Sequence, residues 1–127
     1  MTDRAGTLAL VRAYHRAWTS QDFDEAGRYL SDDLRTDVPI NTYGSKAEWI
    51  QAVRGTRQAV TGIEVLAEFS NDGEALLLYD MEIKPIGDIR VAEHFSVADG
   101  RITMIRHVHD TAALRAAGFG REAHRQD

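Results

Sequence analysis

The sequence has 127 residues, a formal net charge of −5 and no cysteine. Apolar residues make up 43% of it and charged residues 28%, which is the composition of a globular domain rather than of a disordered chain. The absence of cysteine excludes disulfides and thiol chemistry, and arginines spread along the chain without a basic patch argue against a nucleic-acid partner.

The sequence also predicts a single domain that does not act at a membrane. No run approaches the roughly 18 apolar residues that a membrane-spanning helix needs. The segment Met1–Gly6 lacks the basic and then apolar layout of a signal peptide. No internal repeat, linker or low-complexity stretch interrupts residues 1–127. We therefore expect one cytoplasmic domain.

Helices are predicted in the first half of the chain. Residues 7–20 carry apolar side chains at helical spacing, and residues 23–30 form a shorter helix of the same kind. Residues 34–40 indicate a strand, which Pro39 confines to an edge or an end of a sheet. Ser45-Lys-Ala-Glu48 has the spacing of a capping box and opens a third helix.

From Gly62 onward the apolar residues alternate, which predicts strands. Four such segments follow one another, over residues 63–69, 75–83, 89–97 and 102–109, and turn-forming residues separate them. These turns favour antiparallel hairpins, and a short helix over residues 111–117 ends the pattern at Gly118. Helices followed by an antiparallel sheet predict an α+β fold in which the helices cover one face of the sheet.

Three stretches of the chain resemble one family. Residues 14–24 and 29–33 resemble the opening helix pair of ketosteroid isomerases and SnoaL-like proteins, and residues 44–49 resemble the start of their third helix. Residues 95–102, followed by 107–110, resemble their final hairpin and closing segment. The resemblance implies a nuclear transport factor 2-like (cystatin-like α+β barrel) fold. In it, three N-terminal helices lie on the concave face of a cone-like, curved, mostly antiparallel sheet around one pocket.

The resemblance implies a range of functions rather than one. The superfamily includes isomerases, cyclases, dehydratases, epoxide hydrolases and binding proteins without activity, so the fold does not give the function. Its chemistry mostly needs no cofactor and no metal. Its members also commonly form homodimers through the convex face of the sheet, and we expect a homodimer here because the helices can cover only one face.

The register of the last strand decides which polar residues reach the pocket. Strict alternation from the turn at Gly100 places Glu93 on the inner face and leaves His107 and His109 outside. In ketosteroid isomerases, the residues five, seven and nine places after this glycine line the pocket. The resemblance therefore turns Ile105, His107 and His109 inward and requires a bulge in the strand.

In the bulged register, Glu93 and His107 face the same cavity. A carboxylate beside an imidazole favours its charged form and fixes its orientation, which suits general acid–base catalysis. His107 stands where epoxide hydrolases of this fold carry an aspartate, which argues against epoxide hydrolysis. The alternatives are a solvent-facing histidine pair and a metal site formed by His107, His109 and Glu93.

Tyr14 matches, by its spacing to Asp22, the tyrosine with which ketosteroid isomerases stabilise an enolate oxygen. Other parts of that machinery are missing. Val91 stands where the acidic oxyanion donor is expected. The proton-carrying aspartate falls at Asp37 or at Val38, and alternation turns Asp37 outward. These departures argue against steroid isomerisation, and a purely structural role in the core is the alternative for Tyr14.

The remaining candidates are predicted to form the pocket wall or to lie outside it. The predicted substrate-binding residues are Trp18, Asp37, Tyr43, Trp49, Phe69, Tyr79, Phe95, Ile105 and His109. Asp80 and Glu82 are expected on the solvated face of their strand, Asp110 at the start of the last helix, and His15 on the exposed side of the first helix.

Two function classes follow from these residues. The first is a cofactor-free isomerase, cyclase or dehydratase that acts by proton transfer on a small apolar organic molecule, such as a polyketide- or terpenoid-like intermediate. In this class His107 is the acid/base, Glu93 orients it and Tyr14 donates to the developing oxyanion. The second is a ligand-binding or dimerisation module of the same fold without activity.

Overall fold

The computed structural model describes residues 3–118, which form four helices and five strands. In chain order these are α1 (Arg4–Thr19), α2 (Phe23–Arg28), β1 (Leu30–Asp37), α3 (Lys46–Ala59), β2 (Val60–Ser70), β3 (Glu74–Ile83), β4 (Gly87–Ala98), β5 (Arg101–Val108) and α4 (Ala112–Ala116). The predicted order of helices and strands is confirmed. None of the described helices is long and apolar enough to cross a membrane.

Side chains cap both long helices, and the sequence predicts the cap of α3 but not that of α1, which begins at Arg4 rather than at the predicted residue 7. The carboxylate of Asp3 accepts a hydrogen bond from the amide of Gly6 at 2.8 Å and starts α1. The Ser45 hydroxyl accepts from the amide of Glu48 at 3.1 Å and starts α3. Oε1 of Glu48 reaches back to the amide of Gly44 at 3.2 Å, one residue before the position that a standard capping box uses.

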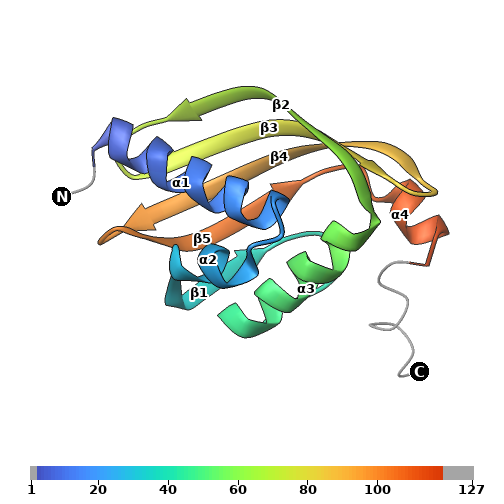
Figure 1. Cartoon of the computed structure of the whole chain (residues 1–127), viewed down its shortest axis with the longest axis horizontal. Coiled ribbons are helices and arrows are strands. Elements are labelled where there is room, and N and C mark those ends of the chain that lie inside the picture. The colour runs from blue at the N-terminus through green and yellow to red at the C-terminus, as the bar shows by residue number, and fades with distance from the viewer. Residues whose placement is uncertain (1–2, 119–127) are drawn as a thin grey trace.

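The five strands form one sheet in the order β1-β5-β4-β3-β2. β1 is parallel to β5, and the other neighbours are antiparallel. Helices α1, α2 and α3 lie on one side of this curved sheet, and α4 lies near the end at which β3 turns into β4 (Figure 1). The predicted α+β fold, with N-terminal helices packed on a mostly antiparallel sheet, is therefore confirmed.

A bulge interrupts the pairing of β4 with β5 close to their turn. Ser96 pairs with Met104 and Val97 with Ile102, so Thr103 is an extra residue on β5. The Thr103 hydroxyl donates to the carbonyl of Ser96 at 3.2 Å. One extra residue moves the rest of a strand to the opposite face. The bulged register is thus confirmed, and Glu93 stands directly opposite His107.

Strand β1 begins four residues earlier than the predicted start at residue 34. Its first residue, Leu30, is fully buried and pairs with Ile102, whose amide donates to the carbonyl of Tyr29 at 2.8 Å. The polar residues that follow Leu30 fall where the pairing shifts register, so they show no alternation. β1 is an edge strand, as predicted, but it ends at Asp37 rather than at the predicted residue 40, so Pro39 lies outside it.

Aromatic rings pack against one another in the interior between α1 and the sheet. Tyr14 and Phe95 are fully buried and pack edge to face at 5.9 Å. The prediction that His15 is exposed is wrong: it is 9% exposed, and its ring lies 5.0 Å from that of Tyr79. The reason is that β2 also packs on α1, where Glu68 pairs with Arg12 at 2.6 Å, so two neighbouring sides of the helix are covered.

Candidate active site

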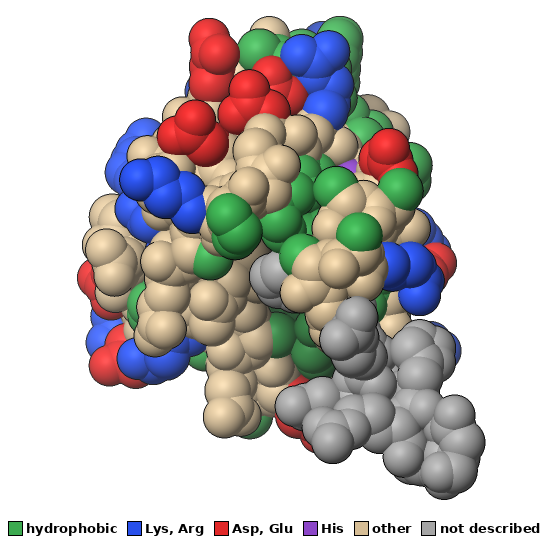
Figure 2. All heavy atoms as spheres, turned by 90° about the vertical axis from the view of Figure 1, so that its right-hand side faces the viewer, with side chains coloured by type: hydrophobic (Ala, Val, Ile, Leu, Met, Phe, Trp, Pro, Cys, Tyr) green, Lys and Arg blue, Asp and Glu red, His purple; other side chains and the backbone are tan. Residues whose placement is uncertain are grey.

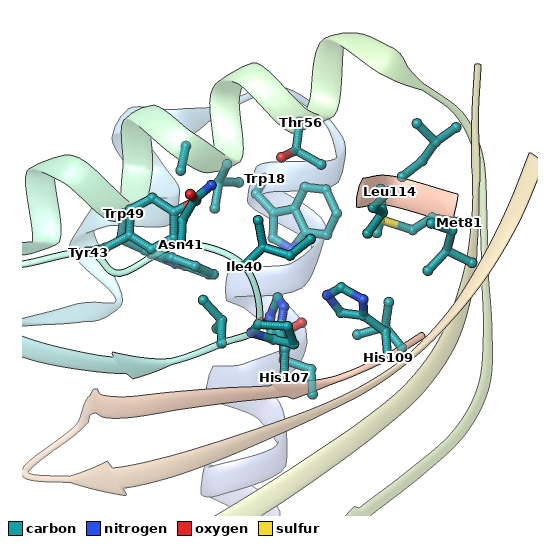
Figure 3. A pocket seen from close by; sticks show the side chains of 18 of the residues that line it. Trp18, Ile40, Asn41, Tyr43, Trp49, Thr56, Met81, His107, His109 and Leu114 are labelled. Atoms are coloured by element: carbon teal, nitrogen blue, oxygen red, sulfur yellow. The ribbon is translucent and has the colours of Figure 1, made fainter. Parts of the chain in front are cut away.

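A cavity of about 140 Å³ lies between the inner face of the sheet and helices α1, α3 and α4. Most of its wall is apolar or aromatic, and Figure 3 shows side chains from these elements converging on it. The lining residues are Tyr14, Trp18, Val38, Pro39, Ile40, Asn41, Tyr43, Trp49, Ala52, Val53, Thr56, Ala59, Tyr79, Met81, Ile83, Ile89, Val91, Glu93, His107, His109 and Leu114.

At the α4 end of the molecule, the surface has an apolar centre. On the face turned to the viewer in Figure 2, hydrophobic side chains gather near the middle, and charged side chains lie mainly toward the edges. Leu114 of α4, Ile83 at the end of β3 and Ile89 near the start of β4 all line the cavity. The cavity thus extends toward this end of the sheet between apolar residues.

Glu93 and His107 form a charged contact in the wall of this cavity. The register that pairs β4 with β5 brings Oε2 of Glu93 to 2.9 Å from Nε2 of His107. Nε2 of His107 has no hydrogen-bond partner among the described residues, and the contact becomes an ion pair when the ring is protonated. The His107 side chain is 17% exposed and that of Glu93 is 2% exposed. The carboxylate is therefore sealed from solvent, whereas the imidazole ring borders the cavity.

Neighbours keep the buried Glu93 carboxylate ionised. Burial on its own raises the pKa of Glu93, but His107 lowers it most strongly and His15 and the Tyr79 hydroxyl lower it further, so that the net pKa lies below the usual value. Tyr79 donates its hydroxyl to Oε1 of Glu93 at 2.8 Å. Burial and the charge of Glu93 raise the pKa of Tyr79 well above its usual value, so Tyr79 remains a neutral donor.

Tyr14 presents a second neutral hydroxyl at the cavity. Its oxygen accepts a hydrogen bond from Nε1 of Trp49 at 2.9 Å, in a buried contact between α1 and α3. No acceptor for the Tyr14 hydroxyl hydrogen lies among the described residues, so this hydrogen is available to a ligand. Burial, together with the charge of Glu93, raises the pKa of Tyr14 well above its usual value. Tyr14 can therefore donate a hydrogen bond at any ordinary pH.

A second histidine lies beside His107. His107 and His109 are two positions apart on the same face of the chain, and both rings point into the cavity (Figure 3). Their ring centroids are 6.3 Å apart. Nδ1 of His109 lies 3.2 Å from the carbonyl oxygen of Asp110. Burial lowers the pKa of His109, and the charge of His107 acts in the same direction.

The structure brings eight of the twelve predicted site residues to the cavity and places four elsewhere. Asp37 points outward, as alternation predicts, with its side chain 75% exposed and 4.0 Å from Arg106, so its assignment to the pocket is corrected. Phe69 is 64% exposed because it points away from α1, which its neighbour Glu68 contacts. Phe95 and Ile105 are fully buried in the core rather than at the cavity.

Other predicted positions lie where the sequence places them. Asp80 pairs with Arg90 at 2.8 Å at the surface, and Asp110 accepts a hydrogen bond from the amide of Ala112 at 2.9 Å at the start of α4. Within residues 3–118, no group of three or more His, Asp and Glu side chains is arranged to hold a metal ion.

Several cavity residues escape prediction because they lie outside regular alternation. Val38 to Asn41 follow β1 as a loop, in which Ile40 has a φ of 81°, a conformation that branched side chains rarely adopt. Thr56 on α3 and Leu114 on α4 point at the cavity from helices whose orientation the sequence does not give. The apolar run from residue 38 to residue 40 is the one available signal, but it predicts the end of a strand, whereas β1 ends at Asp37.

Comparison with known proteins agrees with this architecture. A family model described as SnoaL-like domain matches residues 11–105. A crystal structure of a Kribbella flavida DSM 17836 protein is 31% identical, with a TM-score of 0.82, and the match covers 96% of this chain and 98% of that chain. No curated protein matches.

Two further solved structures share the fold at lower identity. A proposed ketosteroid isomerase from Kribbella flavida DSM 17836 is 19% identical with a TM-score of 0.74, over 88% of this chain and 83% of that chain. An LEH-like epoxide hydrolase from M. tuberculosis is 23% identical with a TM-score of 0.71, over 93% of this chain and 92% of that chain. Since the family model spans most of its length, this chain belongs to the SnoaL-like domain family.

Proposed function

We propose that this chain is an enzyme that transfers protons to and from a small, mostly apolar organic molecule by general acid–base catalysis, without a cofactor. The observation that carries the proposal is the contact of 2.9 Å between His107 and the sealed carboxylate of Glu93, in the wall of an otherwise apolar cavity. A buried carboxylate is costly unless a partner offsets the cost, and such pairs are concentrated at sites that move protons.

Each polar group has a distinct part in this chemistry. His107 exchanges a proton with the substrate, because its ring borders the cavity and imidazole gains and loses protons near neutral pH. Glu93 stabilises the positive charge on that ring, and Tyr79 holds Glu93 in place. Tyr14 donates its free hydroxyl hydrogen to the oxygen on which negative charge develops.

The size of the cavity limits the substrate. A cavity of about 150 Å³ lined by apolar residues accommodates benzene, and this cavity measures about 140 Å³. We therefore propose a substrate whose reacting part is a single ring, with any further groups extending toward the α4 end.

Epoxide hydrolysis is not favoured by this arrangement. Opening an epoxide requires a carboxylate that activates water. Glu93 is the one carboxylate among the described lining residues, and Tyr79 and His107 already contact its two oxygens. The residue type at position 107 therefore favours proton transfer within an organic substrate.

The test uses cyclohex-3-enone, a one-ring ketone whose isomerisation to cyclohex-2-enone is followed by absorbance. We expect the wild-type protein to catalyse this isomerisation, and His107→Ala to lower the rate by about 10²–10⁴-fold, the usual contribution of a positioned acid/base. The matched control is His94→Ala, which removes the neighbouring histidine on β4 that pairs with Glu74 outside the cavity. Equal rates for wild type, His107→Ala and His94→Ala would contradict the proposal and favour a binding module.

A further inference from the structure

The two cavity histidines have different surroundings, and the difference gives each ring a different role. His107 and His109 both line the cavity, with ring centroids 6.3 Å apart (Figure 3). A distance of this size lets two groups act on neighbouring atoms of one small molecule.

His107 presents Nδ1 to the cavity. Its Nε2 is buried and lies 2.9 Å from Oε2 of Glu93, so this nitrogen is held against the carboxylate. The negative charge of Glu93 is fixed by burial and by the Tyr79 hydroxyl, and it stabilises positive charge on the ring. In the charged ring both nitrogens carry hydrogen, and Nδ1 can therefore give a proton to a ligand.

His109 presents the opposite chemistry. Its Nδ1 lies 3.2 Å from the backbone carbonyl of Asp110. A carbonyl oxygen only accepts hydrogen bonds, so Nδ1 carries the hydrogen and, in the neutral ring, Nε2 carries the lone pair. Burial and the neighbouring charge of His107 lower the pKa of His109, while the carbonyl and the carboxylate of Asp110 oppose them. These surroundings favour the neutral, basic form of the His109 ring.

We propose that His109 is the base and His107 the acid of a two-histidine site that eliminates water from a one-ring β-hydroxy ketone. The proposal rests on the proposed function and assigns its reaction class. Isomerisation needs one group, which removes a proton and returns it. Elimination needs a base and an acid at the same time, and two rings whose surroundings favour different charge states meet this requirement.

The step balances without any further reactant. Nε2 of His109 takes the proton from the carbon next to the carbonyl, and the electron pair of that C–H bond forms the new double bond. The bond from the next carbon to the hydroxyl oxygen breaks, and the oxygen takes the proton from Nδ1 of His107. The products are a conjugated enone and water. A proton then passes from His109 to His107, through water in the vacated cavity, and restores both rings.

The first arm of the test measures the protonation state of the histidine rings and needs no substrate. Nitrogen-15 NMR of the imidazole rings distinguishes the charged form and the two neutral forms of each histidine. We expect the neutral ring of His109 to carry its hydrogen on Nδ1, and the pKa of His109 to lie below the ordinary histidine value. Hydrogen on Nε2 of the neutral ring, or a His109 pKa at or above the ordinary value, would overturn the proposal.

The second arm measures elimination from 3-hydroxycyclohexanone by the absorbance of the enone formed. His107→Ala and His109→Ala should each lower this rate by about 10²–10⁴-fold, and His94→Ala should leave it unchanged. Loss in His107→Ala with a wild-type rate in His109→Ala would overturn this inference and leave the proposed function intact. Wild-type rates in both variants would overturn this inference and the proposed function together. An unchanged circular dichroism spectrum confirms that each variant is folded.

Discussion

Replacing Tyr79 with phenylalanine tests whether its hydrogen bond stabilises the buried Glu93 carboxylate. Tyr79 is 1% exposed, and its hydroxyl donates to Oε1 of Glu93 at 2.8 Å. A hydrogen bond to a charged group contributes about 1.5–3 kcal/mol to stability, and losing it leaves a buried oxygen without its partner. We therefore expect Tyr79→Phe to lower the free energy of unfolding by about 1.5–3 kcal/mol at neutral pH.

The loss should depend on pH in a defined direction. The pKa of Glu93 lies below its usual value in the folded protein. Its contribution to stability is therefore complete above the unfolded pKa of about 4.3, and it is lost as the pH falls through the lower folded value. Removing the Tyr79 hydroxyl takes away part of this contribution. The difference between the variant and the wild type should thus be full at pH 7 and shrink below about pH 4.

Urea unfolding at several pH values measures this difference, and the chain offers a matched control. Tyr29 also donates to a glutamate, Oε2 of Glu25 at 2.5 Å, but this hydrogen bond is only partly buried. Tyr29→Phe should cost less stability than Tyr79→Phe, because water can replace the hydroxyl. Equal losses in the two variants, or a Tyr79→Phe loss that does not change with pH, would refute the account of Glu93 as a buried, ionised group.

Two further predictions concern residues away from the charged pair. Burial lowers the pKa of His15, although Glu93 and Glu68 oppose it, so stability should fall as the pH drops below the ordinary histidine value of about 6.5. His15→Leu should therefore lose less stability than the wild type between pH 7 and pH 5 in urea titrations, and an equal loss would contradict the burial of a neutral ring. The homodimer predicted from the sequence remains a proposal, and Phe69 is 64% exposed on the side of β2 that faces away from α1. Sedimentation should give the wild type twice the chain mass of 14.2 kDa and Phe69→Asp the chain mass itself, whereas a wild-type protein at 14.2 kDa would rule the dimer out.

Much of the fold can be predicted from the sequence because the local spacing of apolar residues agrees with the helix or strand that each segment forms. Apolar residues recur at helical spacing before residue 60 and alternate after it, and Ser45 and Glu48 mark the start of α3. The start of β1 could not be predicted in this way. Leu30 is held by pairing with Ile102, far along the chain, and the polar residues after it carry no alternation.

The site could be predicted only in part, and the bulge at Thr103 explains why. Alternation alone turns His107 and His109 outward, and only the extra residue on β5 brings them to the cavity. A bulge leaves no clear mark in one sequence, so the register of β5 can be predicted only from the resemblance to ketosteroid isomerases. The exposure of Phe69 and the burial of His15 depend on how β2 curves past α1 (Figure 1), which no local pattern records.

The measurement that tests the central claim most directly is the NMR titration of the Glu93 carboxyl group in the wild type and in His107→Ala. The substitution removes the imidazole whose Nε2 lies 2.9 Å from Oε2 of Glu93. We predict that the pKa of Glu93 rises in the variant, because His107 is the neighbour that lowers it most strongly, and that the pKa of Glu74, which pairs with His94, does not change. A Glu93 pKa that is the same in both proteins would contradict the acid–base pair.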